Sequence, residues 1–309
     1  MDGILNISKP KGMTSFSTVA TVRRLTGARR VGHAGTLDPE ASGVLPICLG
    51  QGTRVVEFLV ETTKVYRAQI ELGRATDTYD SSGQTTQQGD SSGINHKQLE
   101  SALASFCGLI QQKPPMYSAV KHRGQRLYKL ARAGIQVERR SRPARIHRLE
   151  LTGWQPPLVT IEVVCGKGTY IRSLAHDLGQ ALGCGANLKS LVRLRCGLFG
   201  IGDAISLTQL EDAARHGYWY KLVYPLDTVF LDWAAIVVNE TTEQQVRNGQ
   251  SLALGSQTSG QETACPAEYS LAGSPSRNHC RVYDLDGCFL GVLRFHPESQ
   301  RWHPERVFR

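Results

Sequence analysis

The sequence predicts an α+β fold. Residues 64–72 and 159–163 alternate between apolar and polar side chains, as half-buried strands do, whereas residues 99–106 and 171–178 carry apolar side chains at helical spacing. These segments follow one another without a regular strand–helix–strand rhythm, so a purely parallel α/β sheet is not indicated.

The N-terminal region is expected to begin with a buried strand over residues 3–7, which ends in a turn at residues 9–12. Thr14 or Ser15 can then cap a helix that continues to about Leu25. The apolar stripe of this helix is predicted to consist of Phe16, Val19 and Ala20.

A glycine-punctuated loop over residues 32–39 leads to the apolar run 44–49. The next strand is expected to place on its apolar face the side chains of Tyr66, Ala68, Ile70 and Leu72. Residues 81–93 are rich in Ser, Gly and Gln, which predicts a flexible loop.

The turn at residues 166–168 connects the strand over 159–163 to a helix. The buried stripe of that helix is predicted to be Ile171, Leu174, Ala175 and Leu178. Gly179 stands where the helix is expected to stop.

The character of the chain changes after Pro225. Residues 230–309 suggest short strands, an insert rich in Gly, Ser and Thr near 254–276, and a hairpin that turns at Asp286 and Gly287. We therefore expect two domains, a larger one over residues 1–229 and a small β-rich one over 230–309.

Composition favours a soluble globular protein, because 40% of the 309 residues are hydrophobic and 20% are charged. No apolar stretch is long enough to cross a bilayer, and the start Met1-Asp2-Gly3 is unlike a basic signal sequence, so we expect a cytoplasmic protein. None of the eight cysteines forms a CxxC pair, which predicts reduced, mostly buried thiols and no metal site.

Positive charge is concentrated in one segment. Residues 113–148 contain eleven Lys or Arg and a single acid, Glu138, for a net charge of +10. The whole chain carries +9, so the remainder is close to neutral at −1. This clustering indicates a site for a polyanion such as RNA, although a solvated basic face is the alternative.

Asp38 is the candidate catalytic residue of the loop over 32–39. Pro39 stiffens the chain after it, and the two glycines of the loop let the backbone pass close to another molecule. Such an acid could act as a nucleophile or general base if a cation kept it ionised, whereas an ordinary Asp-Pro turn is the plainer interpretation.

Arg172 could supply that cation, because it begins a helix and lies off its apolar stripe; the alternative is a surface ion pair. Tyr66 and Tyr170 could stack on an extruded base or could be ordinary core tyrosines. His33 could contact RNA, act as an acid or base, or be a plain loop residue.

Taken together in order, these features resemble the TruB family of tRNA pseudouridine synthases. The similarity covers roughly residues 3–229 and rests on the segments 3–15, 32–39, 64–67, 72–80, 114–121, 126–128, 167–179 and 191–195. It departs from the family at Ser8, where many members have Asp. It is also loose in the C-terminal region.

The resemblance implies a mixed, mostly antiparallel catalytic sheet flanked by helices, a basic thumb-like insertion over about 112–148 and a C-terminal PUA-like domain. It also implies that Asp38 is the catalytic carboxylate, Arg172 its ion-pair partner and Tyr66 the stacking residue for uracil. Tyr170 would contact the base or assist proton removal, His33 would hold the opened RNA loop, and Leu191 would line the base pocket. The RNA-binding side chains of the insertion are expected to be Lys121, Arg123, Arg126, Arg139, Arg140, Arg142 and Arg145.

The implied activity is isomerisation of uridine 55 in the T-loop of tRNA, without metal or cofactor. Enzymes that act on a base generally extrude the nucleotide into a closed pocket. A guide-RNA-dependent relative of the dyskerin type is the nearest competing interpretation, but such enzymes lack this basic insertion. A non-catalytic tRNA-folding factor is the other, and it would leave Asp38, Arg172 and Tyr66 unexplained. We expect no guide RNA, no obligatory protein partner and a monomer.

Overall fold

The computed structural model describes residues 1–253 and 278–308, so the insert expected near 254–276 lies outside the described residues. The large sheet is built from β1 (Gly3–Lys9), β2 (Val31–His33), β3 (Ser42–Leu49), β4 (Lys64–Leu72), β7 (Gly108–Gln112), β10 (Arg142–Gln155), β11 (Leu158–Cys165), β12 (Ala186–Cys196) and β13 (Phe199–Gly200). Its main path runs β1-β3-β12-β4-β11-β10-β7, and every pair is antiparallel except β3 with β12. The prediction of a mixed, mostly antiparallel sheet is confirmed.

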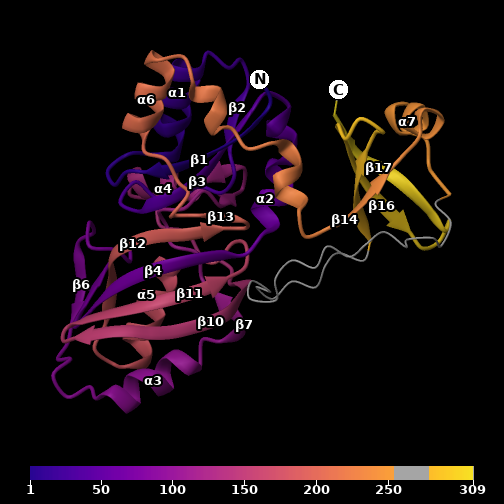
Figure 1. Ribbon diagram of the computed structural model, residues 1–309. Helices are drawn as coiled ribbons and strands as arrows, with labels where there is room; N and C mark the ends of the chain where they lie inside the picture. Colours follow the sequence, from indigo (N-terminus) through magenta and orange to yellow (C-terminus); the bar gives the residue numbers. More distant parts are fainter. Residues whose placement is uncertain (254–277, 309) are drawn as a thin grey trace.

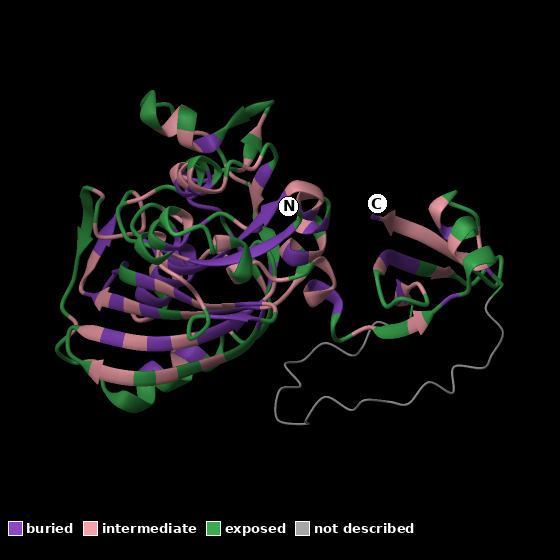
Figure 2. Cartoon of the chain, turned by 45° about the horizontal axis from the view of Figure 1, so that its top comes forward, coloured by how far each residue is buried: buried purple, intermediate pink, exposed green. Residues whose placement is uncertain are grey.

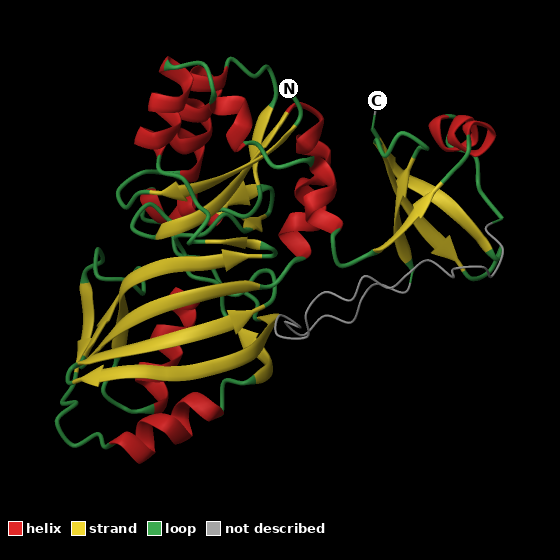
Figure 3. Cartoon of the chain, viewed as in Figure 1, coloured by secondary structure: helices red, strands yellow, loops and turns green. Residues whose placement is uncertain are grey.

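Two groups of helices cover the sheet (Figures 1 and 3). α1 (Ser15–Thr26) and α6 (Leu207–Arg215) pack on each other and on the β1–β3 end. α3 (His96–Ala104) packs on β10, and α5 (Ile171–Ala181) packs on β4 and β12. The remaining short elements near β1 and β3 are η1 (Gly50–Val55), α2 (Val56–Glu61), η2 (Trp219–Leu222) and η3 (Leu226–Phe230).

The core lies between the sheet and these helices (Figure 2). Ala68, Ile70 and Leu72 of β4 are buried there, as the alternation of apolar and polar side chains predicts. The stripe of α5 is buried against them, including Leu174 and Leu178. Burial of large apolar side chains is the main favourable term in folding, so this shared core fixes how α5 sits on β4 and β12.

The predicted stripe of α1 is right at Val19 and wrong at Phe16 and Ala20, which are exposed. Phe16 is 80% exposed, and the buried positions are Ser15, Thr18, Val19 and Val22. Ser15 and Thr18 are tolerated inside because their hydroxyls are paired, with Leu37 and with the Thr14 carbonyl respectively. The tertiary hydrogen bonds between Ser15 and Leu37 therefore place Ser15 inside and Phe16 outside.

Two loop predictions also fail. Gly179 lies inside α5, which continues to Ala181. The backbone of Gly185 and Ala186 passes where a side chain at this position would stand, so the glycine allows a close approach and does not end the helix. The segment 81–93, predicted to be a flexible loop, contains the strand β6 (Thr85–Gln88), which pairs with β5 (Arg74–Thr76). These strand residues are polar and exposed, so no apolar alternation marks them in the sequence.

The basic segment contains a small hairpin and a short helix. β8 (Lys121–His122) pairs with β9 (Gln125–Arg126), and α4 (Leu127–Arg132) follows. Leu127 is buried and anchors this helix. The segment then returns to the large sheet where β10 begins at Arg142.

A second sheet forms the C-terminal region, to one side of the larger sheet (Figure 1). It consists of β14 (Ala234–Val237), β15 (His279–Tyr283), β16 (Phe289–His296) and β17 (Arg301–Val307), with α7 (Glu240–Arg247) beside it. The hairpin predicted at Asp286 and Gly287 is confirmed, with Gly287 at φ 78°. The β-rich character of this region is therefore confirmed.

The two sheets meet through aromatic side chains. Phe230 is fully buried and contacts the rings of Phe58, Trp233 and Phe289. Arg54 donates to the Val307 carbonyl at 2.7 Å.

The cysteines are free thiols among the described residues; five are buried, whereas Cys107 and Cys288 are exposed. Within residues 1–253 and 278–308, no helix is long and apolar enough to cross a membrane.

Candidate active site

Asp38 lies in a loop that the N-terminal segment holds in place. The Ser15 hydroxyl donates to the Leu37 carbonyl at 3.0 Å and accepts from the Leu37 amide at 2.9 Å. The ammonium group of buried Lys9 donates to the Pro39 carbonyl at 3.2 Å. The residues on both sides of Asp38 are therefore fixed, while its own side chain remains 40% exposed.

Arg172 is the partner of Asp38. Its Nε lies 2.8 Å from Oδ2 of Asp38, and its side chain is only 5% exposed. The N–H of Nε does not satisfy the direction of a hydrogen bond to that oxygen, so the contact is an ion pair rather than an aligned hydrogen bond. The contact places a buried, permanently charged guanidinium beside a carboxylate that remains accessible from solvent.

Three further groups fix the guanidinium of Arg172. Nη2 donates to the Tyr117 carbonyl at 2.7 Å, and Nη1 donates to the Thr78 carbonyl at 3.3 Å. Nη1 also lies 3.6 Å from Oδ2 of Asp80, whose side chain is 16% exposed. Arg172 thus bridges two carboxylates, of which Asp38 is the more accessible.

Tyr66 and Arg193 face each other across the paired strands β4 and β12. Arg193 is 1% exposed and donates to the carbonyls of Val44 and Gly35 at 2.6 and 3.1 Å. Burial raises the pKa of Tyr66 to about 12, and Arg193 acts in the opposite direction. Tyr66 is therefore a neutral phenol at pH 7, on the helix-covered face of the sheet.

His33 and Leu191 lie on strands next to this pair. His33 ends β2 opposite Ile47, and burial, followed by the charge of Arg193, lowers its pKa. Its imidazole is therefore uncharged at neutral pH. Leu191 is 9% exposed and pairs with Ala68 of β4, two residues from Tyr66.

Tyr170 precedes α5 and is held by Gln112. The amide of Gln112 accepts from the Tyr170 N–H at 2.9 Å and donates to the Tyr170 carbonyl at 3.1 Å. Burial raises the pKa of the Tyr170 hydroxyl. The two bonds fix the backbone immediately before Arg172.

Comparison with known proteins identifies the family to which this chain belongs. Residues 23–171 match the family described as TruB family pseudouridylate synthase (N terminal domain), and residues 172–231 match the tRNA pseudouridylate synthase B C-terminal domain. A tRNA pseudouridine synthase B of Dehalococcoides mccartyi (strain CBDB1) is 43% identical over 309 residues, which is 100% of this chain and 97% of the relative. The chain belongs to the TruB family.

Other relatives agree with this assignment. The tRNA pseudouridine synthase B of Symbiobacterium thermophilum is 50% identical over 213 residues, 68% of this chain and 71% of that protein. A solved structure described as a Cbf5-Nop10-Gar1 complex matches with a TM-score of 0.71 at 26% identity, covering 99% of this chain and 84% of the other. This TruB-family chain is thus an isomerase of the pseudouridine synthase type.

The structure brings together Asp38 and Arg172 directly, whereas Tyr66 and His33 lie near Arg193. Leu191 lies two residues before Arg193 on β12, opposite Ala68. The sequence patterns assign no individual role to Lys9, Asp80, Gln112 or Arg193. The available signal was a charged residue within an apolar strand pattern, at Lys9 in β1 and Arg193 in β12. Nothing in the sequence indicates that Gln112 turns inward.

The basic side chains differ in their surroundings. Those that point to solvent are Lys121, Arg123, Arg126, Arg140, Arg142 and Arg145. Arg139 is half-buried, and its Nη1 donates to the Pro114 carbonyl at 2.9 Å.

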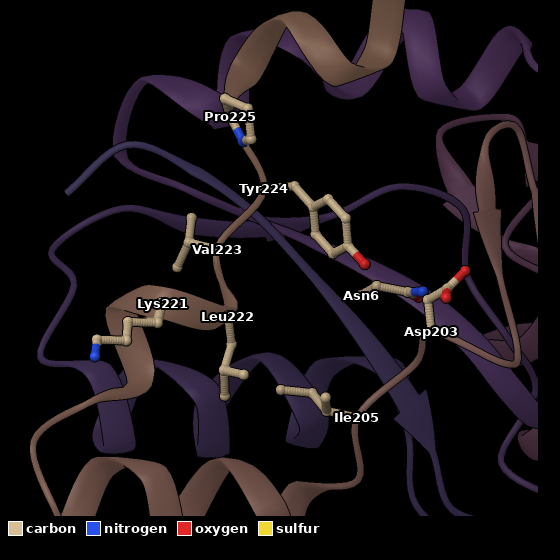
Figure 4. A pocket seen from close by; sticks show the side chains of 8 residues that line it. All are labelled: Asn6, Asp203, Ile205, Lys221, Leu222, Val223, Tyr224 and Pro225. Carbon is tan, nitrogen blue, oxygen red and sulfur yellow. The ribbon is translucent and has the colours of Figure 1, made fainter.

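A cavity of about 340 Å³ lies elsewhere on this TruB-family chain (Figure 4). It is lined by Asn6, Asp203, Ile205, Lys221, Leu222, Val223, Tyr224 and Pro225. The Tyr224 hydroxyl points toward Asn6 and Asp203. Neither Asp38 nor Arg172 lines this cavity, so it is separate from the ion-pair cluster.

Proposed function

We propose that this protein converts uridine 55 in the T-loop of tRNA to pseudouridine, acting alone with Asp38 as its essential carboxylate. The ion pair between half-exposed Asp38 and buried Arg172 carries the proposal. The names of the relatives, tRNA pseudouridine synthase B, support the substrate class.

The reaction moves uracil without losing it. The bond between the ribose anomeric carbon and N1 of uracil breaks, the base turns, and a bond from C5 to the same carbon forms. The proton on C5 leaves and N1 gains one, so substrate and product are isomers. Asp38 attacks either the anomeric carbon or the ring, and Arg172 holds its carboxylate in one orientation for that step.

The base is proposed to enter the site in an extruded conformation. Tyr66 offers a neutral ring for stacking, and Leu191 closes the apolar side of the pocket. Tyr170 lies against the base or assists the loss of the C5 proton. Uncharged His33 holds the opened RNA loop by hydrogen bonding or stacking rather than by charge.

The exposed arginines and lysine of the basic segment are proposed to bind phosphates of the T-arm. Arg139 belongs to the same segment, but its side chain is half-buried. We place the catalytic domain in residues 1–229 and assign RNA binding to the C-terminal domain, residues 230–309. No guide RNA or obligatory protein partner is proposed, and the enzyme is expected to act as a cytoplasmic monomer.

Pseudouridine formation in an unmodified T-arm transcript tests the proposal. Wild type should form product without any guide RNA, whereas Asp38→Asn should bind the transcript and form none. A transcript with cytidine at position 55 should stay unmodified. Binding without product by the wild type would favour a guide-dependent enzyme or an RNA-folding factor instead.

The basic segment allows a separate prediction. Replacing Arg140, Arg142 and Arg145 together by Gln should weaken tRNA binding and reduce the slope of log affinity against log salt by roughly two to three, because each phosphate contact contributes nearly one. Titrations at several salt concentrations measure both quantities. An unchanged slope would remove the segment from the RNA-binding surface.

A further inference from the structure

Tyr79 has a backbone conformation that residues other than glycine rarely adopt. Its φ is 65°, in the left-handed region that favours glycine. Its ring is stacked on the imidazole of His176, with centroids 3.9 Å apart and planes 11° apart. On the same ring, the guanidinium of Arg139 lies 6.0 Å from the centroid. Three segments distant in the sequence thus meet at one tyrosine.

The stack is continuous with the contacts of Arg172. His176 follows Arg172 by four residues in α5, so the two side chains lie on one face of the helix. Arg172 contacts the residues on both sides of Tyr79, namely the carbonyl of Thr78 and the carboxylate of Asp80. One face of α5 therefore contacts the three consecutive residues Thr78, Tyr79 and Asp80. Arg172 contacts the first and the third, and His176 contacts the ring of Tyr79 between them.

Stacking is the contact that fixes the imidazole of His176. Its Nδ1 is buried and has no hydrogen-bond partner among residues 1–253 and 278–308. Burial and the nearby charge of Arg139 lower the pKa of His176, so a neutral ring faces Tyr79. The parallel rings therefore lie in close face-to-face contact without a charge on either of them.

Arg139 connects the stack to the basic segment. Its Nη1 binds the Pro114 carbonyl, and its guanidinium covers Tyr79, so this charge points inward while its neighbour Arg140 points to solvent. The same segment contacts α5 at two further points. The Tyr117 carbonyl accepts from Nη2 of Arg172, and the Lys113 carbonyl accepts from the Ser173 hydroxyl at 2.8 Å.

We propose that Arg139, Tyr79 and His176 form a positioning stack that holds Asp80 and Arg172 in register with Asp38 and couples the basic segment to that pair. The inference rests on the proposed role of Asp38 and Arg172. Arg139 is then a positioning residue rather than a phosphate contact, and the strained backbone of Tyr79 is maintained because its ring is needed in the stack.

Single-turnover rates at saturating enzyme, together with the Kd for the T-arm transcript, test the stack. Arg139→Gln, Tyr79→Ala and His176→Ala should each lower the saturated rate roughly three- to tenfold, with Kd within about twofold of wild type. Arg140→Gln, by contrast, should raise Kd. His216→Ala is the matched control, because it removes a histidine stacked on Tyr218 outside the site, and it should change neither quantity.

Rescue separates positioning from general damage to the fold. Tyr79→Phe and His176→Phe keep a ring in the stack and should restore the rate to within about twofold of wild type. The double variant Arg139→Gln/His176→Ala should be no slower than the slower single variant, because both changes break one unit. If an alanine variant does not fold, Arg139→Gln and the two phenylalanine variants still decide the question.

The inference is overturned if Arg139→Gln weakens binding as Arg140→Gln does while the rate is unchanged, or if His176→Phe is as slow as His176→Ala. A wild type that forms no pseudouridine, or an active Asp38→Asn, is a failure of the proposed function itself. Wild-type rates in all stack variants, with Asp38→Asn inactive, would reject the stack alone.

Discussion

Arg172 is a buried charge with four partners of two kinds. The carbonyls of Thr78 and Tyr117 fix its plane, and the carboxylates of Asp38 and Asp80 balance its charge. Burying a guanidinium is costly unless it is paired and hydrogen-bonded, so these contacts are needed for the residue to be inside at all. Asp80 is the less exposed of the two acids, so under the proposed function it is the fixed counterion and Asp38 is the acid available to substrate.

Asp80→Asn tests this division. It keeps the shape of the side chain but removes one of two negative charges beside Arg172, so the guanidinium should shift toward Asp38 and misplace it. We expect kcat to fall roughly 10- to 100-fold, since small misplacements of reacting groups have effects of this size. Single-turnover kinetics with the T-arm transcript measure it. Asp90→Asn is the control and should be neutral, because this exposed turn carboxylate accepts hydrogen bonds from the amide and hydroxyl of Ser92, away from Arg172.

Lys9 provides a pH-dependent test of stability. Burial lowers its pKa to about 8 from 10.5, despite the opposing charges of Asp38 and Glu40. Between pH 8 and pH 10.5, Lys9 is protonated in the unfolded chain and has lost its proton in the folded chain. Lys9 therefore makes the free energy of unfolding rise with pH over this range.

Relative to Lys9→Met, the wild type should therefore gain about 2 kcal/mol in free energy of unfolding as the pH rises from 7.5 to 10. Urea unfolding of both proteins at the two pH values measures the change. An equal difference at both would mean that Lys9 is not desolvated in the folded protein.

At the scale of elements, one face of α5 organises the site. Arg172, His176 and Gly179 follow at positions i, i+4 and i+7, so they form one line along the helix. Arg172 reaches the two acids, His176 stacks on Tyr79, and Gly179 lets the chain at Gly185 and Ala186 approach the helix.

Gly179→Ala should be destabilising, although alanine is the better helix former. The added methyl group would meet backbone atoms of Gly185 and Ala186, and overpacking of this kind costs about 1–3 kcal/mol. Thermal and urea unfolding measure it, with exposed Gln180→Ala on the same helix as the control. Equal stability of the two variants would contradict the close approach.

Some elements can be predicted from the sequence and others cannot. β4 is predictable because alternation of side chains is a local property of a strand with one buried face. The buried face of α1 is not, because it depends on Leu37, 22 residues from Ser15.

Within the site, the pairing of Asp38 with Arg172 is expected from the motifs. The second acid, Asp80, is not, since only the folded chain brings it to Nη1 of Arg172.

At the scale of the whole molecule, the C-terminal sheet is joined to the larger one by an aromatic cluster. Phe230 lies at its centre, and an ion pair between Arg306 and Glu57 lies at its rim. Apolar burial gives most of the stability of such an interface, while exposed ion pairs give little.

Phe230→Ala should lower the free energy of unfolding by about 3–5 kcal/mol, as expected for removal of a fully buried ring. Arg306→Gln, which breaks the ion pair, should cost less than about 1 kcal/mol. Calorimetry of both variants compares the two contributions. A larger loss from Arg306→Gln would mean that charge rather than packing joins the sheets.

The place of β12 in the large sheet has a consequence for synthesis of the chain. β12 lies between β3 and β4, yet about 120 residues separate the end of β4 from the end of β12. At about 5–20 residues per second, a ribosome needs on the order of 6 to 24 s to make that stretch. During this interval the nascent chain carries two open strand edges, which are the features most prone to pair with other chains. The register that sets Tyr66 opposite Arg193 forms only when β12 fills this gap. A fragment that ends before residue 186 would therefore keep both edges open and be prone to aggregate.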